Sequence, residues 1–134
     1  LVERLLARGE RVFVLVRPQS ALKLEALREF WGARASRVVP VAGNLSEPNL
    51  GVSRADLRKL TGKVDHLFHL AAVYDLQATA EEQDLANIVG TDHAMQFAEA
   101  VQAGCFHHAS SIAAAGLYQG SFRENMFEEA SGLE

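Results

Sequence analysis

Apolar residues along the chain follow two alternating patterns. Short consecutive apolar runs are typical of strands buried on both faces of a sheet, whereas apolar residues that recur every three or four positions are typical of amphipathic helices. The runs predict strands over residues 11–16, 37–41, 64–70 and 105–109. The helical spacing predicts helices over residues 1–8, 20–32, 54–60 and 80–103, whereas residues 120–134 show no clear period.

Polar residues and glycines mark the ends of these predicted elements. Ser20 and Ser53 stand directly before helical stretches, where a hydroxyl can cap the first turn. Gly9 and Gly104 follow helical stretches and are expected to end them. Pro40 lies inside a predicted strand and indicates a position that makes no ladder hydrogen bond.

Each predicted strand is separated from the next by a predicted helix. Strands joined in this way run parallel through right-handed crossovers, so the order predicts an α/β fold with a doubly wound parallel sheet. The helical pattern begins at Leu1 with no capping residue ahead of it. We therefore expect residues 1–134 to form a partial domain that is truncated at both ends and lacks the strand before its first helix.

Composition narrows the class of protein. The 134 residues suit one domain, and the apolar fraction of 49% is enough for a core. The net charge of −4 argues against a nucleic-acid partner, which demands a basic face. No apolar run approaches the length of about 20 residues that a membrane span needs. Cys105, the single cysteine, cannot form an internal disulfide, so we expect a soluble, cytoplasmic protein.

The strand predicted over residues 64–70 leads directly into Ala71 and Ala72. Small residues at the carboxyl end of a strand leave room for a ligand to lie across the backbone. In open α/β sheets, ligands bind at that end of the strands. A tight turn that needs small residues is the alternative interpretation.

Polar side chains follow the first two predicted strands. Arg17 follows the first strand, at the place where an arginine in a dinucleotide-binding fold can bind the 2′-phosphate of NADP. Asn44 and Leu45 follow the second, where an amide can bond an adenine edge while an apolar neighbour packs on the ring. A solvated arginine and an Asx turn are the structural alternatives.

The longest predicted helix and the last predicted strand carry further candidates. Asn87 and Thr91 are four residues apart and share a helix face, and Gly90 between them suggests close approach to another element. Ser110 and Ser111 end the last strand, where a hydroxyl can stabilise charge on a substrate oxygen. A satisfied core asparagine and a turn capped by Ser110 are the alternatives.

The histidines do not predict a metal site. His66 and His69 are three apart on one predicted strand and point to opposite faces, and the adjacent His107 and His108 also diverge. Cys105 has no partner at metal-ligand spacing. We therefore expect no metal ion.

Five motifs stand in one order along the chain. They are Val-Leu-Val-Arg at 14–17, Gly-Asn-Leu at 43–45, His-Leu-Ala-Ala at 69–72, Asn-Ile-Val-Gly-Thr at 87–91 and Ser-Ser at 110–111. Together they resemble the extended short-chain dehydrogenase/reductase family, whose NAD(P)-binding domain has a Rossmann-like fold. The stretch over residues 69–75 looks most like the branch of thioester and fatty-acyl reductases.

The resemblance implies roles for the residues that match. Arg17 resembles the residue that selects NADP(H) over NAD. Asn44 and Leu45 match the adenine side of the cofactor, although the family usually has Asp where this chain has Asn44. Ala71 and Ala72 match the small residues beside the pyrophosphate and ribose. Leu70 and Ser110, next to these positions, are assigned to the same cofactor-binding surface. We call the surface formed by Leu70, Ala71, Ala72 and Ser110 the cofactor shelf.

The resemblance also implies a catalytic group. Ser111 aligns with the serine or threonine that holds the substrate carbonyl, and Asn87 with the asparagine that supports the active-site geometry. The family's glycine-rich loop would precede Leu1, and its Tyr-x-x-x-Lys pair would follow the last residue. Tyr118 has no lysine four residues on and is not assigned the proton-donor role.

These observations favour a fragment of an NADP-dependent oxidoreductase that acts on a small-molecule carbonyl, alcohol or thioester. We expect the fragment itself to be inactive and the intact protein to form a homodimer. An NAD-dependent sugar-nucleotide epimerase or dehydratase of the same family is an alternative. A non-catalytic nucleotide-binding module that senses redox state is another.

Overall fold

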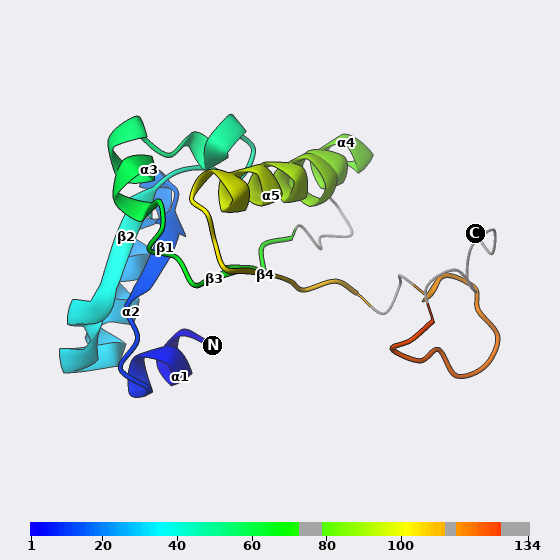
Figure 1. Ribbon diagram of the computed structural model, residues 1–134, viewed down its shortest axis with the longest axis horizontal. Coiled ribbons are helices and arrows are strands. Elements are labelled where there is room, and N and C mark those ends of the chain that lie inside the picture. The colour runs from blue at the N-terminus through cyan, green and yellow to red at the C-terminus, as the bar shows by residue number, and fades with distance from the viewer. Residues whose placement is uncertain (73–78, 112–114, 127–134) are drawn as a thin grey trace.

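The computed structural model describes residues 1–72, 79–111 and 115–126 (Figure 1). The strands are β1 (Val12–Val16), β2 (Val38–Ala42), β3 (His66–His69) and β4 (Cys105–His108). The α-helices are α1 (Val2–Ala7), α2 (Ala21–Trp31), α3 (Arg54–Leu60), α4 (Ala80–Asp84) and α5 (Gly90–Ala100). Short 3-10 helices form η1 (Pro18–Ser20), η2 (Gly32–Arg37) and η3 (Pro48–Gly51), and η4 (Leu85–Val89) is a π-helix.

The strands pair in parallel, as their separation by helices predicts. β1 pairs with β2, with Val12 opposite Val38. β3 pairs with β4, with His66 opposite Cys105. Among the described residues these pairs form two separate two-stranded sheets. The parallel pairing confirms the predicted α/β class.

Helices cover both faces of the β1–β2 sheet, which is the arrangement of a doubly wound fold. On one face, Leu6 of α1 and Leu24 of α2 pack against Val38. On the other face, Val41 packs in a larger cluster with residues from η3 through α5, namely Leu50, Val52, Leu60, Ala94, Phe97 and Val101. Successive strand side chains alternate between faces, so Val38 and Val41 serve opposite layers. Each buried Val, Leu or Phe side chain in these clusters contributes about 1.5–3 kcal/mol of hydrophobic stabilisation.

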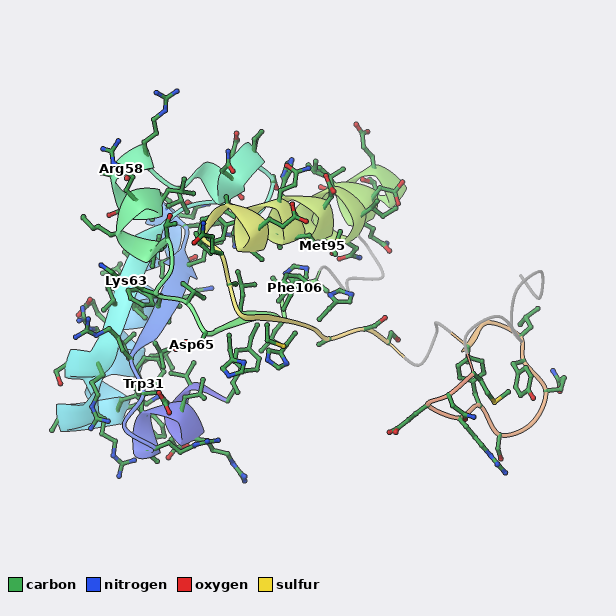
Figure 2. All side chains as sticks on the ribbon, in the orientation of Figure 1. Trp31, Arg58, Lys63, Asp65, Met95 and Phe106 are labelled. Carbon is green, nitrogen blue, oxygen red and sulfur yellow. The ribbon has the colours of Figure 1, made fainter. Side chains whose placement is uncertain are left out.

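The β3–β4 pair lies against α5 (Figure 1). Leu67 and Phe106, which are partners in the parallel register, both pack against the larger cluster. Figure 2 shows Phe106 between β4 and the long helix. One helix therefore sets the position of β3 and β4.

Three of the predicted helix ends have a clear outcome. Ser53 caps α3 as predicted, because its hydroxyl accepts a hydrogen bond of 3.1 Å from the amide of Asp56. Gly9 has a φ of 91° after α1 and so ends that helix as predicted. The prediction for Ser20 is wrong, since its side chain makes no capping hydrogen bond. There η1 runs directly into α2, and no extended residue is left to aim a hydroxyl at the first turn.

The helix predicted over residues 80–103 is real but differs in its interior and its end. It comprises α4, η4 and α5 in succession, with a π-helical segment that the apolar spacing did not predict. It ends at Ala100, and Gln102, with a φ of 56°, provides the left-handed residue that was expected of Gly104. Gly104 has another role, because a Cβ there would lie 2.9 Å from the carbonyl oxygen of Asp65. No helix in the described part of the chain is both long and apolar enough to cross a membrane.

Candidate cofactor site

The carboxyl ends of β1 and β2 lie side by side. The amide of Gly43, just after β2, donates a hydrogen bond of 3.1 Å to the carbonyl of Val16 at the end of β1. Arg17 and Asn44 therefore leave the sheet at the same edge. A Cβ on Gly43 would lie 2.4 Å from the carbonyl oxygen of Leu50, so the chain can turn here only with glycine.

Arg17 borders a cavity of about 260 Å³ at this edge. The lining is mostly apolar, with Arg17 and Glu25 as its charged members; the other residues are Val16, Pro18, Ala21, Leu24, Pro40 and Ala42. Arg17 is exposed, and it takes part in neither ion pair found among the described residues. Its guanidinium is therefore available to a phosphate.

Asn44 forms the Asx turn that was the alternative interpretation of this position. Its side-chain oxygen accepts a hydrogen bond of 3.3 Å from the amide of Ser46, and its own amide donates to the carbonyl of Leu50 at 2.7 Å. The turn fixes the orientation of the side chain. The side-chain NH₂ of Asn44 is the group that this turn leaves to reach an adenine edge.

Leu45 connects this loop to α5. A Cβ on Gly90 would lie 2.8 Å from Leu45 Cγ and Cδ2, which confirms the close approach predicted for Gly90. The carbonyl of Leu45 also lies 3.1 Å from Nδ1 of His93. The Leu45 side chain thus packs on a helix, and its predicted contact with adenine stays a prediction.

A chain of hydrogen bonds joins β3 to the helix that carries Asn87. Thr91 Oγ1 donates to the carbonyl of Asn87 at 2.7 Å and lies 3.0 Å from Nε2 of His69. Because the Thr91 proton is used toward Asn87, Nε2 of His69 carries the proton of the second bond. The Asn87 carbonyl lies within the π-helix η4, and π-helical turns of this kind are frequent at functional sites.

His69 is the buried polar residue of this network, with 5% of its surface exposed. Burial lowers the pKa of its imidazole, and the nearby His108, whose ring lies 5.3 Å away between centroids, lowers it further. His69 is therefore neutral near pH 7. This agrees with a fixed tautomer that donates to Thr91.

The carboxyl ends of β3 and β4 also lie side by side, since the amide of Ala109 donates a hydrogen bond of 3.1 Å to the carbonyl of His69. The residues that follow the two strands are all exposed at this edge: Leu70, Ala71, Ala72, Ser110 and Ser111. Residues 73–75 of the family-like stretch lie outside the described residues, as do residues 112–114.

The structure therefore brings the predicted residues together in two groups. One group joins Arg17 and the loop of Asn44 and Leu45, and the other joins residues 70–72 to residues 110–111. Each group is tied to the same helix, the first through Leu45 and Gly90 and the second through His69 and Thr91. Within the described ranges, no ion pair joins Arg17 to the second group.

Sequence reasoning missed one cluster. His66, Cys105 and His107 have ligand atoms that all lie within 4.8 Å of one another. The prediction of no metal was based on spacing within single strands, whereas these side chains come from two paired strands. The parallel register is the signal that could have found them.

Comparison with known proteins identifies the family. The model of an NAD-binding family described as "Male sterility protein" matches residues 1–132. The chain belongs to this family. Its membership confirms the resemblance to extended short-chain dehydrogenases/reductases, and the chain is an NAD(P)-binding reductase-family domain.

Two curated relatives support this identification. The chain is 32% identical over 87 residues to a linear gramicidin synthase component of Brevibacillus parabrevis, covering 64% of this chain and 2% of that protein. It is 30% identical over 95 residues to "Putative fatty acyl-CoA reductase CG8303" of Drosophila melanogaster, covering 70% of this chain and 18% of that protein. The chain thus spans a small part of either relative.

A solved structure supports the fold. The terminal R domain from the myxalamid PKS-NRPS biosynthetic pathway superposes with a TM-score of 0.79 and 23% identity, covering 96% of this chain and 38% of that one. The described strands and helices thus share the fold of that domain.

Proposed function

We propose that this NAD(P)-binding domain belongs to an NADP(H)-dependent reductase that acts on an acyl thioester or the carbonyl derived from it. The observation that carries the proposal is the placement of three residues just past the carboxyl ends of parallel strands, where doubly wound sheets bind ligands. Arg17 directly follows β1, whereas Ala72 and Ser111 come three residues after the ends of β3 and β4. The name of a fatty acyl-CoA reductase among the similar proteins supports the substrate class.

The residues after β1 and β2 would hold the adenosine half of the cofactor. Arg17 would donate two parallel charge-assisted hydrogen bonds to a 2′-phosphate. The Asn44 side-chain NH₂, held by its Asx turn, would donate to an adenine ring nitrogen, with Leu45 beside it. The exposed guanidinium at the rim of a mostly apolar cavity, in which Glu25 is the other charged residue, fits this donor set.

The residues after β3 and β4 would hold the reacting half. Ala71 and Ala72 would line the pyrophosphate and ribose, because their methyl side chains let an anionic chain pass close to the backbone, and Leu70 would lie beside them. Ser110 would add a hydroxyl to this shelf. A bound reduced nicotinamide supplies the hydride, and the Ser111 hydroxyl would donate a hydrogen bond to the substrate oxygen as negative charge develops on it.

Asn87 would act as a positioning residue. Its carbonyl accepts from Thr91, which in turn accepts from the neutral His69 at the end of β3. This network would fix the π-helix relative to the strand that carries the cofactor shelf. We propose further that the substrate is a small molecule and that the protein is cytoplasmic. The 134-residue fragment alone would be inactive.

The sheet would be completed by one more parallel strand. In the doubly wound order 3-2-1-4-5-6, the pairs β2–β1 and β3–β4 correspond to the strands on either side of the first one. A strand ahead of α1 would satisfy the inner edges of both β1 and β3. A longer polypeptide that includes this strand should unfold at a higher urea concentration than the 134-residue chain.

A second copy of the chain is the proposed macromolecular partner. Leu85, Ile88 and Met95 recur at helical spacing on η4 and α5, with exposed fractions of 46%, 65% and 45%. They lie apart from the buried Ala94 and Phe97 on the same helical segment. Pairing of this stripe with its symmetry mate would bury it. Ile88→Glu should then convert a dimer to a monomer in sedimentation velocity.

The experiment that tests the function measures cofactor binding in the longer protein. NADPH should bind more tightly than NADH, and Arg17→Ala should lower NADPH affinity about tenfold or more while leaving NADH affinity nearly unchanged. Arg34→Ala, another exposed arginine, serves as the matched control. Equal affinities for the two cofactors in the unaltered protein would refute the assignment of NADP(H).

A further inference from the structure

Two histidines and the single cysteine share one face of the β3–β4 pair. His66 lies directly opposite Cys105 in the parallel register, and His107 is two residues beyond Cys105 on the same strand. Side chains of paired residues, and of residues two apart, point to the same face of a sheet. Leu67 and Phe106, which pack toward α5, occupy the other face. The three side chains therefore project away from the helix.

The ligand atoms are close enough to share an ion. A ring nitrogen of each histidine and Cys105 Sγ all lie within 4.8 Å of one another. His66 Nδ1 and His107 Nε2 are 3.0 Å apart. A tetrahedral zinc ion with nitrogen and sulfur ligands needs separations of about 3.3–3.6 Å between its ligand atoms. The His66 and Cys105 side chains are exposed, so rotation of these two can adjust their distances to His107 toward this range.

We propose that His66, Cys105 and His107 bind a divalent transition-metal ion of the zinc class. Imidazole and thiolate are the ligands that select zinc, whereas magnesium and calcium require oxygen ligands, which this set lacks. Three protein ligands leave the fourth tetrahedral position to water. Two of the ligands are exposed and the third, His107, is partly buried, so an ion can enter from solvent.

The surroundings hold one ligand in place. The ring of Phe68 stacks on His107 with centroids 4.4 Å apart and planes inclined by 10°. This contact restricts rotation of the His107 ring and keeps its Nε2 toward His66. The ordering cost of forming the site is thereby reduced.

Metal binding changes the protons at the site in a defined way. The contact of 3.0 Å between His66 Nδ1 and His107 Nε2 needs one proton on one of the two nitrogens. When both lone pairs turn to the metal, that proton transfers to the other nitrogen of its own ring. Cys105 binds the metal as a thiolate, so any thiol proton passes to solvent as the metal–sulfur bond forms.

The site is separate from the proposed cofactor shelf. The shelf residues follow the ends of the strands, whereas the metal ligands lie within β3 and β4. His69 and its Thr91 contact belong to the helix-facing side of the pair. NADPH affinity and metal affinity are therefore independent measurements, and failure of one proposal leaves the other testable.

The test is a titration of the full chain with Co²⁺ under a phosphine reductant, followed by Zn²⁺. We expect one Co²⁺ per chain, visible bands of tetrahedral cobalt and a near-ultraviolet thiolate-to-cobalt charge-transfer band, all abolished by Zn²⁺. Cys105→Ser should remove the charge-transfer band. His66→Gln and His107→Gln should each weaken binding by at least about tenfold, the loss that removal of even an outer-sphere partner can cause.

His108→Gln is the matched control, because His108 is the neighbouring histidine on β4 whose ring stacks on His69 instead. It should leave Co²⁺ affinity within about twofold, well below the loss from removing a partner of the metal site. A further measurement needs no variant: Zn²⁺, but not Mg²⁺, should slow alkylation of Cys105 in the unaltered chain. Absence of saturable Co²⁺ binding, or equal weakening by His108→Gln, would overturn the proposal.

Discussion

Leu45 and Gly90 are in direct contact, so that the loop after β2 rests on the first residue of α5. A Cβ on Gly90 would lie 2.8 Å from two carbon atoms of the Leu45 side chain, and Gly90 is buried. His93, one turn further along, lies 3.1 Å from the Leu45 carbonyl through its Nδ1. The helix thus holds a loop that would approach the adenine of a bound cofactor.

Gly90→Ala should destabilise the protein in spite of the higher helix propensity of alanine. The propensity gain is about 1 kcal/mol, whereas forcing a methyl group into a packed contact costs about 1–3 kcal/mol. We expect a net loss of about 1 kcal/mol in the free energy of unfolding, measured by urea denaturation of the longer protein.

A double-mutant cycle isolates the contact. Leu45→Ala removes the atoms that a Gly90 methyl group would strike. In that background Gly90→Ala should become neutral or stabilising, because only the propensity term remains. The same loss in both backgrounds would show that the contact does not determine the choice of glycine.

The example of Gly90 shows what the sequence could and could not predict. A glycine inside a helical pattern signals close approach, but its partner, Leu45, is distant along the chain and could not be named. Parallel pairing followed from the alternation of strands and helices. The register did not, and it is the register that places His66 opposite Cys105.

A helix cap could be predicted where the capping residue alone determines it, but not where a neighbouring element changes the backbone conformation of that residue. Ser53 precedes α3 in an extended conformation and caps it, whereas Ser20 is carried into helical geometry by η1 and does not. The π-helix at η4 was not predictable, because Leu85, Ile88 and Val89 fit an α-helix equally well. The predicted roles of Arg17, Ala72 and Ser111 rest on the family and on their positions after strands.

Acid should weaken the fold through His69. Burial lowers the pKa of His69 in the folded chain below 6.5, the ordinary value that the unfolded chain has. Between those two pKa values the unfolded state binds more protons, so stability falls as pH falls below about 6.5 and is retained above it. For a single proton, the slope cannot exceed about 1.4 kcal/mol per pH unit.

The measurement compares urea unfolding at pH 7.5 and pH 5.5 for the unaltered protein and for His69→Gln, which cannot be protonated. His69→Gln should lose stability at pH 7.5 but show a smaller difference between the two pH values. His93→Gln is the matched control, since His93 is a partly buried histidine on α5 with a backbone carbonyl beside it. An unchanged pH dependence in His69→Gln would exclude this mechanism.

Thr79 should stabilise the start of the helix that carries Asn87. Its hydroxyl accepts a hydrogen bond of 3.2 Å from the Glu82 amide, and the Glu82 carboxylate accepts one of 2.9 Å from the Thr79 amide. Thr79→Ala should cost about 1 kcal/mol in the free energy of unfolding, and Thr79→Ser should cost much less because it keeps the oxygen. Equal losses in the two variants, measured by urea denaturation, would show that the reciprocal cap is not the source of the stability.

Ser111 should affect the chemical step and Ser110 the cofactor. In the longer protein, Ser111→Ala should lower kcat about 100-fold, because a hydrogen-bond donor to the developing oxyanion is lost, while the Kd for NADPH stays nearly unchanged. Ser110→Ala should instead raise the Kd for NADPH. Ser36→Ala is the control, because the Ser36 hydroxyl donates to the Ala33 carbonyl in a distant 3-10 helix. Steady-state kinetics with an acyl thioester and fluorescence titration of NADPH separate the two effects. A fall in cofactor affinity equal to the fall in kcat for Ser111→Ala would place this hydroxyl on the cofactor and not on the substrate oxygen.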